Sequence, residues 1–291
     1  MAERILLPPA CSVAGVRARL EQISRKPNKA LGQNFLVDEP ALHEMLAAVS
    51  VAGRPVIEIG AGLGALTFAL LGAGAKALCT IEKDAHMADA LQEATASDKR
   101  VSVYREDALK SNFADMHAHM GGGELLIAGN LPYYITTPLI LHALNCGLAA
   151  HLLFMLQQEA ADRFFAQPSS KQYGPLTVFA RCGYACTRVM ELSPSSYFPQ
   201  PDVHSSVVLL TQTATPPGGF LEFLQSVFAM RRKTLVNNLL TRNFDKPAIY
   251  AALEQLNIAQ GARAESLPHD RLLALYLALY PAATKVSPSL L

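Results

Sequence analysis

Short apolar runs alternate with helical patterns through the middle of the chain, from about residue 55 to residue 210. Runs rich in Val, Ile and Leu are typical of strands buried on both faces, and apolar residues spaced by three and four indicate helices. The alternation predicts repeated βα units around a mostly parallel sheet. The expected strands are 56–59, 77–81, 101–104, 125–128, 152–156, 187–192 and 205–210. The expected helices between them are 65–71, 85–94, 138–144, 159–165 and 176–182.

The last two expected strands are joined only by the Ser- and Pro-rich segment 193–201, which is too short for a parallel crossover. They are therefore expected to run antiparallel, which completes a seven-stranded α/β sheet with a reversed final strand. After a break rich in Thr, Pro and Gly, the segments 220–240, 248–256 and 267–280 have helical periodicity alone. The expected domains are a basic N-terminal extension (1–30), an α/β domain (31–212) and a C-terminal helical domain (218–285).

Size and composition are those of a globular protein. The chain has 291 residues, 51% of them hydrophobic and 17% charged, and can bury a substantial core. No apolar run reaches the roughly 18 to 20 residues of a membrane span. The apolar residues 5–7 are followed at once by two prolines, which makes a poor signal peptide, so a cytoplasmic location is expected.

The five cysteines are an odd number and do not suggest a disulfide framework in a chain of this size. Cys182 and Cys186 have a metal-like spacing but no second pair nearby, so buried thiols are expected. His117 and His119 precede three glycines and are expected in a solvated loop. No metal is expected.

Charge is distributed unevenly along the chain. Residues 1–30 carry six basic and two acidic residues, and residues 217–291 carry eight and five, whereas eleven basic and seventeen acidic residues lie between them. Basic flanks around an acidic centre suit a protein that holds a polyanion with its ends. A solvated surface gives the same pattern without any partner.

A glycine-rich segment, EIGAGLGA at residues 58–65, follows the first expected strand. Its glycines, Gly60 and Gly62 among them, permit a tight turn and a close approach of the backbone to a ligand. Glu82 ends the second strand, where a carboxylate can accept hydrogen bonds from both hydroxyls of a ribose. The segment also fits the dinucleotide pattern Gly-x-Gly-x-x-Ala, so an NAD-dependent oxidoreductase is an alternative.

Two further polar residues follow the next strands. Asp107 comes after the third strand, placed to receive the amine of a cofactor adenine, and Asn130 comes after the fourth. Carboxyl ends of parallel strands meet at one edge of a sheet, where α/β proteins bind ligands. Together these strand ends favour S-adenosylmethionine over NAD. For each acid alone, a surface or capping carboxylate remains the alternative.

The turn Asn130, Leu131, Pro132 and Tyr133 has the residue types needed to alkylate an exocyclic amine. The lone pair of an adenine amine is delocalised into the ring, so it must be localised and aimed. The side-chain oxygen of Asn130 and the carbonyl of Leu131 or Pro132 can each accept one amine hydrogen. Tyr133 can stack on the base. A strand end followed by a helix cap is the structural alternative.

Five ordered motifs carry a resemblance to a known family. They are KALGQNFL at 29–36, EIGAGLG at 58–64, NLPY at 130–133, YFPQPDVHS at 197–205 and RRKTLVNNL at 231–239. Over these motifs, from about residue 29 to residue 279, the chain strongly resembles the KsgA-type small-subunit (16S) ribosomal RNA adenine N6,N6-dimethyltransferases.

The resemblance implies a Rossmann-like class I methyltransferase that uses S-adenosylmethionine. It implies transfer of two methyl groups to N6 of each of two adjacent adenosines, in a hairpin loop near the 3′ end of small-subunit ribosomal RNA, during ribosome biogenesis. Phe198 is implied as a second ring on the target base, opposite Tyr133, with a core aromatic as the alternative. The implied cofactor-binding residues are Asn34, Leu36, Gly60, Gly62, Glu82, Asp107 and Asn130.

The RNA-contacting residues are expected to be Arg231, Arg232 and Lys233, inside the first C-terminal helix. Phosphate contacts position RNA and make its binding depend on salt; a solvated helix face is the alternative. The net charge of +1 is low for an RNA-binding protein. A partly assembled small subunit, with shape and proteins as well as phosphates, is therefore the expected partner, and a monomer is the expected state.

Three other functions are compatible with parts of this pattern. A large-subunit ribosomal RNA methylase that confers macrolide resistance is the alternative within the same class, although segments 231–239 and 263–265 argue against it. A mainly non-catalytic ribosome assembly factor would need no intact turn at Asn130. The NAD oxidoreductase would bind nicotinamide in place of S-adenosylmethionine.

Overall fold

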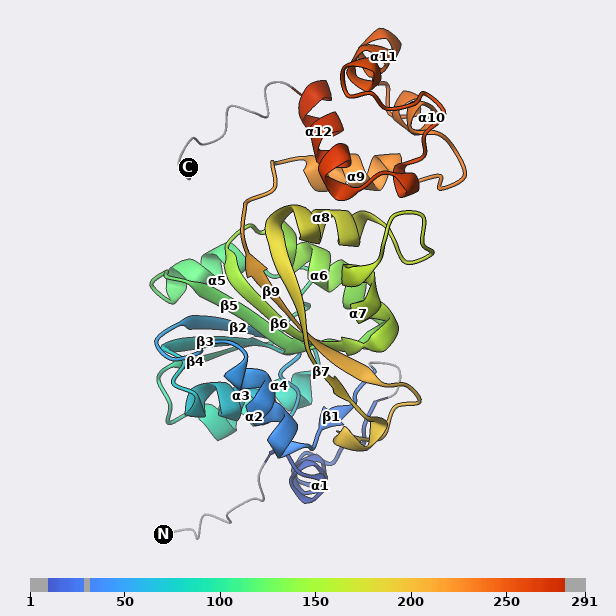
Figure 1. Cartoon of the computed structure of the whole chain (residues 1–291). Helices are drawn as coiled ribbons and strands as arrows, with labels where there is room; N and C mark the ends of the chain where they lie inside the picture. The colour runs from blue at the N-terminus through green and yellow to red at the C-terminus, as the bar shows by residue number, and fades with distance from the viewer. Residues whose placement is uncertain (1–9, 29–31, 281–291) are drawn as a thin grey trace, which may run out of the picture. The chain divides into compact units, whose positions relative to one another are not determined.

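The computed structural model describes residues 10–28 and 32–280, which form two compact units (Figure 1). The first unit runs to Ala161 and resumes at Thr187–Thr211, and the second comprises Asp162–Cys186 and the chain from Gln212 onward. The second unit thus includes part of the expected domain 31–212, and the domain limits set from the sequence stay a prediction. Residues 1–9 and 29–30 of the expected basic extension, the start of the motif at 29–36 and residues 281–285 lie outside the described residues.

A seven-stranded sheet forms the centre of the first unit, in the order β4-β3-β2-β5-β6-β9-β7. Strands β4, β3, β2, β5 and β6 are parallel to one another, and β9 is antiparallel to β6. This confirms the mostly parallel α/β sheet with an antiparallel last strand. The strands are β2 (Pro55–Ile59), β3 (Ala77–Ile81), β4 (Val101–Tyr104), β5 (Leu125–Asn130), β6 (Ala149–Gln157), β7 (Tyr184–Leu192) and β9 (Ser205–Gln212).

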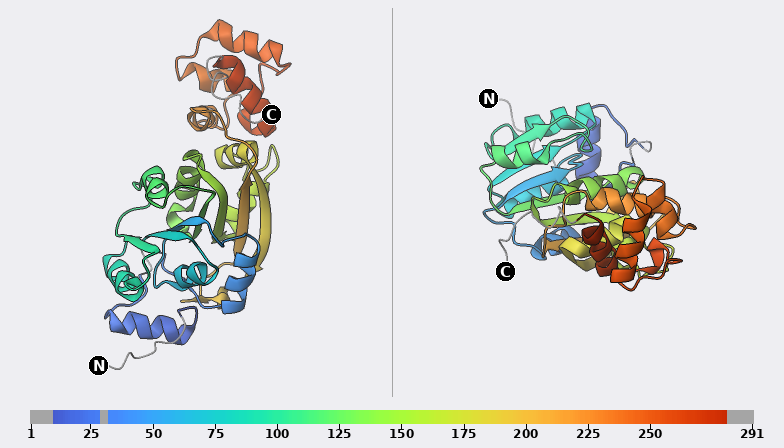
Figure 2. Two further views of the ribbon diagram at one scale, coloured as in Figure 1. Left: turned by 90° about the vertical axis from the view of Figure 1, so that its left-hand side faces the viewer. Right: turned by 90° about the horizontal axis from the view of Figure 1, so that it is seen from above.

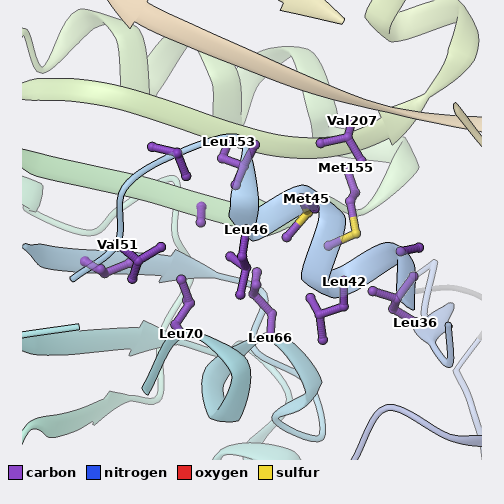
Figure 3. Close-up of a cluster of buried hydrophobic side chains, with 14 of the residues drawn as sticks. Leu36, Leu42, Met45, Leu46, Val51, Leu66, Leu70, Leu153, Met155 and Val207 are labelled. Carbon is purple, nitrogen blue, oxygen red and sulfur yellow. The ribbon is translucent and has the colours of Figure 1, made fainter. Parts of the chain in front are cut away.

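Helices cover both faces of this sheet. Figure 1 shows α2 and α3 on one face and α5 and α6 on the other. Leu42, Met45 and Leu46 of α2 pack with α3 against Leu153 of β6 and Val207 of β9, as Figure 3 shows. The helices up to β7 are α1 (Val13–Gln22), α2 (Glu39–Ala47), α3 (Ala65–Gly72), α4 (Ala85–Thr95), α5 (Phe113–His119), α6 (Thr136–Asn145), α7 (Gln158–Phe165) and α8 (Pro175–Gly183).

Helix α5 corrects the expectation that His117 and His119 belong to a loop. Asn112 caps this helix by accepting from the amides of Ala114 and Asp115, and the glycines begin only after its end. The cap allows a short helix where apolar periodicity is too brief to indicate one. Helix α2 is capped in the same way by Asp38, with a proline in its first turn.

A second, two-stranded sheet pairs the segment before α2 with the segment before β9. Phe35 lies opposite Phe198, and Leu36 lies opposite Tyr197. Val16 and Leu20 of α1 pack on Phe35 and Phe198, so α1 covers the small sheet. The strands are β1 (Phe35–Leu36) and β8 (Tyr197–Phe198), with the 3₁₀ turn η3 (Pro194–Ser196) before β8. This long-range pairing was not expected from the sequence.

The second unit ends in four helices, which form the orange and red group in Figure 2. A ring cluster of Phe179, Phe220, Phe223 and Tyr276 joins α8, α9 and α12 within this unit. The helices are α9 (Phe220–Val227), α10 (Leu235–Leu240), α11 (Lys246–Gln255) and α12 (His269–Leu279), with the 3₁₀ turn η4 (Ala264–Ser266) before α12.

The expected single helix over 220–240 is wrong, because the chain turns between α9 and α10. Asn238 is fully buried, and its side chain accepts from the Met230 amide and donates to the Met230 carbonyl. Thr234 caps α10 by accepting from the Asn237 amide. These side chains satisfy backbone groups that a continuous helix would satisfy itself. Arg231, Arg232 and Lys233 therefore lie in a turn.

All five cysteines are free, in agreement with the absence of a disulfide framework. Cys11 and Cys79 are buried, and the other three are partly buried. Within residues 10–28 and 32–280, three or more His, Cys, Asp or Glu side chains do not come together in a metal-like group. In that same part of the chain, every helix is too short or too polar to cross a membrane.

Candidate active site

A cleft lies at the carboxyl ends of β2, β3, β4 and β5, with about 1110 Å³ of empty space when the open solvent at its mouth is included. The cleft brings together side chains that are far apart in the sequence, because parallel strands end at the same edge of the sheet. The turn residues Leu131, Pro132 and Tyr133 line it as well. All the residues expected to bind the cofactor line this one cleft: Asn34, Leu36, Gly60, Gly62, Glu82, Asp107 and Asn130.

The glycine turn between β2 and α3 depends on left-handed backbone conformations. Gly60, Gly62 and Gly64 have φ of 74°, 55° and 90°. A Cβ at Gly64 would come within 2.8 Å of the Phe68 ring and 2.9 Å of Leu91. The turn therefore needs glycine for both conformation and space, and it keeps the backbone close to the floor of the cleft.

Glu82 is buried beneath this turn, at the end of β3. One of its carboxylate oxygens accepts from the Gly62 amide at 2.8 Å, and the other accepts from the Asp84 amide at 2.7 Å. Burial raises the pKa of Glu82, while these backbone donors oppose the rise. The carboxylate holds the glycine turn in place and keeps a lone pair on each oxygen for a ligand hydroxyl.

Glu58, on β2, also lines the cleft, and sequence reasoning gave it no role beyond its motif. Its side chain is buried, and Thr67 of α3 donates to Oε2 at 2.6 Å. Burial raises the pKa of Glu58 to about 8, against the opposing effect of the Thr67 hydroxyl and with a further rise from Glu82. The sequence could have marked Glu58, because an acid inside an apolar run that forms a fully buried strand is rare.

We expect Glu58 to make the protein less stable as the pH rises. The folded chain binds this proton more tightly than the unfolded chain, whose glutamate has a pKa near 4.5. Its contribution to stability is therefore complete below about pH 4.5 and is lost as the pH rises to about 8. Denaturant unfolding at pH 5 and pH 8 should show a loss of about 3 to 4 kcal/mol that Glu58→Gln removes. The exposed Glu44→Gln is the control, and equal pH dependence in both variants would contradict the expectation.

Asp107 follows β4 and faces the cleft, but its carboxylate is already paired. Lys83 Nζ lies 2.9 Å from Asp107 Oδ2, and the Leu109 amide donates to Oδ1 at 3.1 Å. The hydrogen bond from Lys83 lowers the pKa of Asp107. Lys83 is a residue of the site that the sequence did not single out.

The side chain of Asn130 is oriented by the segment before α2. Its Nδ2 donates to the Asn34 carbonyl at 2.9 Å. The other end of the amide is then Oδ1, which can only accept. Asn34 thus fixes which end of the Asn130 amide is an acceptor, and it does so from a residue 96 positions away.

The two carbonyls that follow differ in their partners. The Pro132 carbonyl accepts from the Ile135 amide at 3.2 Å and from the Thr136 hydroxyl at 2.9 Å, in the turn that leads through η2 (Tyr133–Ile135) into α6. Among the described residues, no such hydrogen bond reaches the Leu131 carbonyl. Of the two carbonyls that the sequence suggested as acceptors for the amine, that of Leu131 is therefore the one that can accept a hydrogen bond from a ligand.

Tyr133 is partly buried at the cleft, and Tyr134 beside it is 52% exposed. The hydroxyl groups of Tyr133 and Ser205, the first residue of β9, lie 3.4 Å apart. Burial raises the pKa of Tyr133, so the phenol stays neutral at physiological pH. The hydroxyl end of the Tyr133 ring thus contacts β9 of the sheet.

Phe198 is absent from the described residues that line the cleft. It pairs with Phe35 in the small sheet and packs on the cluster of Val16, Leu20 and Leu63. The guanidinium carbon of Arg17 lies 5.2 Å from the centre of its ring. The ring is thus packed next to the residues that form the cleft.

The three expected RNA-contacting residues are exposed but not equivalent. Arg231 forms an ion pair with Glu265, with 2.8 Å between the charged groups, and donates to the carbonyls of Lys171 and Ser170. It therefore connects three segments of the second unit. Arg232 and Lys233 share its turn.

The sheet with its reversed last strand, and a cleft at the carboxyl ends of its strands, define a Rossmann-like class I S-adenosylmethionine-dependent methyltransferase. A dimethyladenosine transferase from Plasmodium falciparum has a TM-score of 0.69 at 25% identity, covering 86% of this chain and 98% of that one. The 23S rRNA methyltransferase ErmE shares the fold, with a TM-score of 0.59 at 23% identity over 84% of this chain and 99% of its own.

Sequence comparison makes the assignment more specific. The family model described as ribosomal RNA adenine dimethylase matches residues 24–280. A protein named ribosomal RNA small subunit methyltransferase A, from Acidobacterium capsulatum, is 39% identical over 266 residues, which cover 88% of this chain and 93% of that protein. The chain belongs to the ribosomal RNA adenine dimethylase family and is a methyltransferase, as its motifs predicted.

Proposed function

We propose that the protein transfers methyl groups from S-adenosylmethionine to N6 of two adjacent adenosines near the 3′ end of small-subunit ribosomal RNA. The observation that carries this proposal is the oriented amide of Asn130 at the cleft, with the Leu131 carbonyl beside it in sequence. The family and the name of the Acidobacterium relative support the substrate.

The cleft has the groups that this cofactor requires. Glu82 offers two acceptor oxygens for ribose hydroxyls, Asp107 offers an acceptor for an adenine amine, and the glycine turn leaves room at the backbone. Asn34 and Leu36 form the side of the cleft contributed by the N-terminal segment. When bound, S-adenosylmethionine supplies a methyl group on a sulfonium centre.

Asn130 Oδ1 and the Leu131 carbonyl would each accept one hydrogen of the adenine amine. Holding both hydrogens draws the nitrogen lone pair out of the ring and directs it at the methyl carbon. Tyr133 would stack on the base, which has been taken out of its stack. The methylated nitrogen is acidic enough to release its proton to water or to a carbonyl, so a strong base is not needed.

Phe198 is proposed as the second ring on the target base. In support of this role, Phe198 pairs with Phe35, the residue that follows Asn34, whose carbonyl orients Asn130. The present packing of Phe198 against α1 means that this role depends on the ring becoming accessible when RNA binds. A Phe198→Leu variant that methylates at the normal rate would remove the residue from the base site.

The function is tested by the product. Purified protein, S-adenosylmethionine and small subunits from cells lacking this protein should yield N6,N6-dimethyladenosine, located by mass analysis of RNA fragments. Both modified nucleotides are expected in one hairpin loop near the 3′ end. Methylation of large-subunit RNA alone would contradict the proposal and favour the macrolide-resistance alternative.

Arg232 and Lys233 are proposed to contact phosphates of a partly assembled subunit. Their change to alanine, singly and together, should weaken binding and lower its salt dependence by about one unit of slope for each phosphate contact. Arg231→Ala should act mainly on stability, because its partners are protein groups. Binding at several salt concentrations, with melting temperature as the second readout, separates the two effects. An unchanged slope in the double variant would remove this turn from the RNA surface.

A further inference from the structure

The ion pair of Lys83 and Asp107 lies at the expected adenine end of the cleft. Lys83 follows β3 directly after Glu82, and Asp107 lies just beyond β4, the neighbouring strand. Both side chains line the cleft, and Nζ and Oδ2 are 2.9 Å apart. The pair therefore connects two adjacent strand ends next to the residue that would hold the ribose.

The carboxylate of this pair is fixed in orientation. The Leu109 amide holds Oδ1 at 3.1 Å, and Lys83 holds Oδ2. The Lys83 side chain is 51% exposed and that of Asp107 is 23% exposed, so a ligand can reach both. Pairing lowers the pKa of Asp107 and raises that of Lys83, which keeps both groups charged at physiological pH.

An acceptor and a donor side by side match one edge of adenine. Asp107 Oδ2 can accept an additional hydrogen bond, and the ammonium of Lys83 has two further hydrogens to donate. Adenine presents an amine donor next to a ring nitrogen acceptor, with a similar separation. A carboxylate alone would match only the amine.

We propose that Lys83 is a specificity-determining residue for the cofactor, which donates to a ring nitrogen of adenine while Asp107 accepts from the amine. This inference rests on the proposed function, since it takes S-adenosylmethionine as the cofactor.

The test is a cycle of binding measurements with purified full-length protein. S-adenosylhomocysteine and its 1-deaza and 7-deaza forms, each with one ring nitrogen replaced by C–H, are titrated by calorimetry into wild type and Lys83→Met. Methionine keeps most of the length of the side chain and removes its charge and donor. We expect Lys83→Met to bind S-adenosylhomocysteine about tenfold more weakly, the size of one charge-assisted hydrogen bond.

The deaza forms identify the contact. In wild type, one of them should lose about tenfold more affinity than it loses in Lys83→Met, because the variant has no hydrogen bond left to break. Lys110→Met is the matched control: Lys110 also lowers the pKa of Asp107, but through charge alone. It should behave as wild type toward all three ligands.

Three results would count against these ideas in distinguishable ways. Equal losses on both deaza forms in wild type and Lys83→Met would overturn the role of Lys83. Tighter binding of S-adenosylhomocysteine by Lys83→Met would also overturn it, because the ion pair would then compete with the base. If wild type fails to bind S-adenosylhomocysteine at all, the proposed function itself is wrong.

Discussion

Replacing Asn130 by alanine is expected to slow methyl transfer at least about 100-fold while changing cofactor affinity only a few fold. The amide contributes an acceptor that aims the adenine nitrogen, and misplaced reacting groups lose rate by factors of this size. Glu82 and the glycine turn, which would hold the cofactor, do not depend on this side chain for their own contacts. Single-turnover methylation of unmodified small subunits measures the rate, and calorimetry with S-adenosylhomocysteine measures the affinity.

The Asn130→Asp variant distinguishes the role of the accepting oxygen of Asn130 from that of its donating nitrogen. The carboxylate keeps an acceptor for the adenine amine but cannot donate to the Asn34 carbonyl, which would face a charged oxygen at the present distance of 2.9 Å. We expect a rate between those of wild type and Asn130→Ala, about tenfold below wild type. Near-normal turnover in Asn130→Ala would refute the aiming role, and full activity in Asn130→Asp would show that the Asn34 contact has no effect on the rate.

Replacing Glu82 by glutamine is expected to weaken cofactor binding on the order of 100-fold. Both carboxylate oxygens accept from backbone amides, so the glutamine NH₂ group must face the amide of either Gly62 or Asp84. The substitution therefore disturbs the glycine turn and also removes the charge that strengthens hydrogen bonds from the ribose. A change that is conservative in size is disruptive in this position.

Calorimetry with S-adenosylhomocysteine gives the size of the Glu82 effect, and circular dichroism shows whether the fold is retained. Glu93→Gln, an exposed substitution on α4, is the matched control and should bind as wild type does. The maximal rate at saturating cofactor should fall much less than the affinity. A Glu82→Gln variant with unchanged affinity would exclude the carboxylate from the cofactor site.

The central sheet was predictable because each strand is a local apolar run whose burial does not depend on details of its neighbours. The alternation of strands and helices predicted where the strands lie along the chain, and the short linker after Leu192 indicated that β9 is reversed. The positions of Glu82, Asp107 and Asn130 followed from the same rule, since residues directly after parallel strands share one edge. Motif resemblance then supplied the reaction.

Local patterns failed where side chains replace backbone partners. The stretch 220–240 is apolar at helical spacing throughout, yet the buried Asn238 and the cap at Thr234 divide it in two. Neither contact can be inferred from periodicity, because each depends on which backbone groups are left without a helical partner. The same holds for α5 and its cap at Asn112.

The sequence by itself determined the fold class, the family and the residues at the strand ends, because these depend on periodicity and on motifs that are continuous in the chain. Only the tertiary structure decided which atoms of those residues are available. In the structure, the Asn34 carbonyl orients the amide of Asn130, and Asp107 is paired with Lys83. The Pro132 carbonyl accepts a hydrogen bond from Thr136, whereas the Leu131 carbonyl has no such partner among the described residues. The contacts of Asn130 with Asn34 and of Asp107 with Lys83 join residues distant in the chain, and their geometry exists only after the strands have come together.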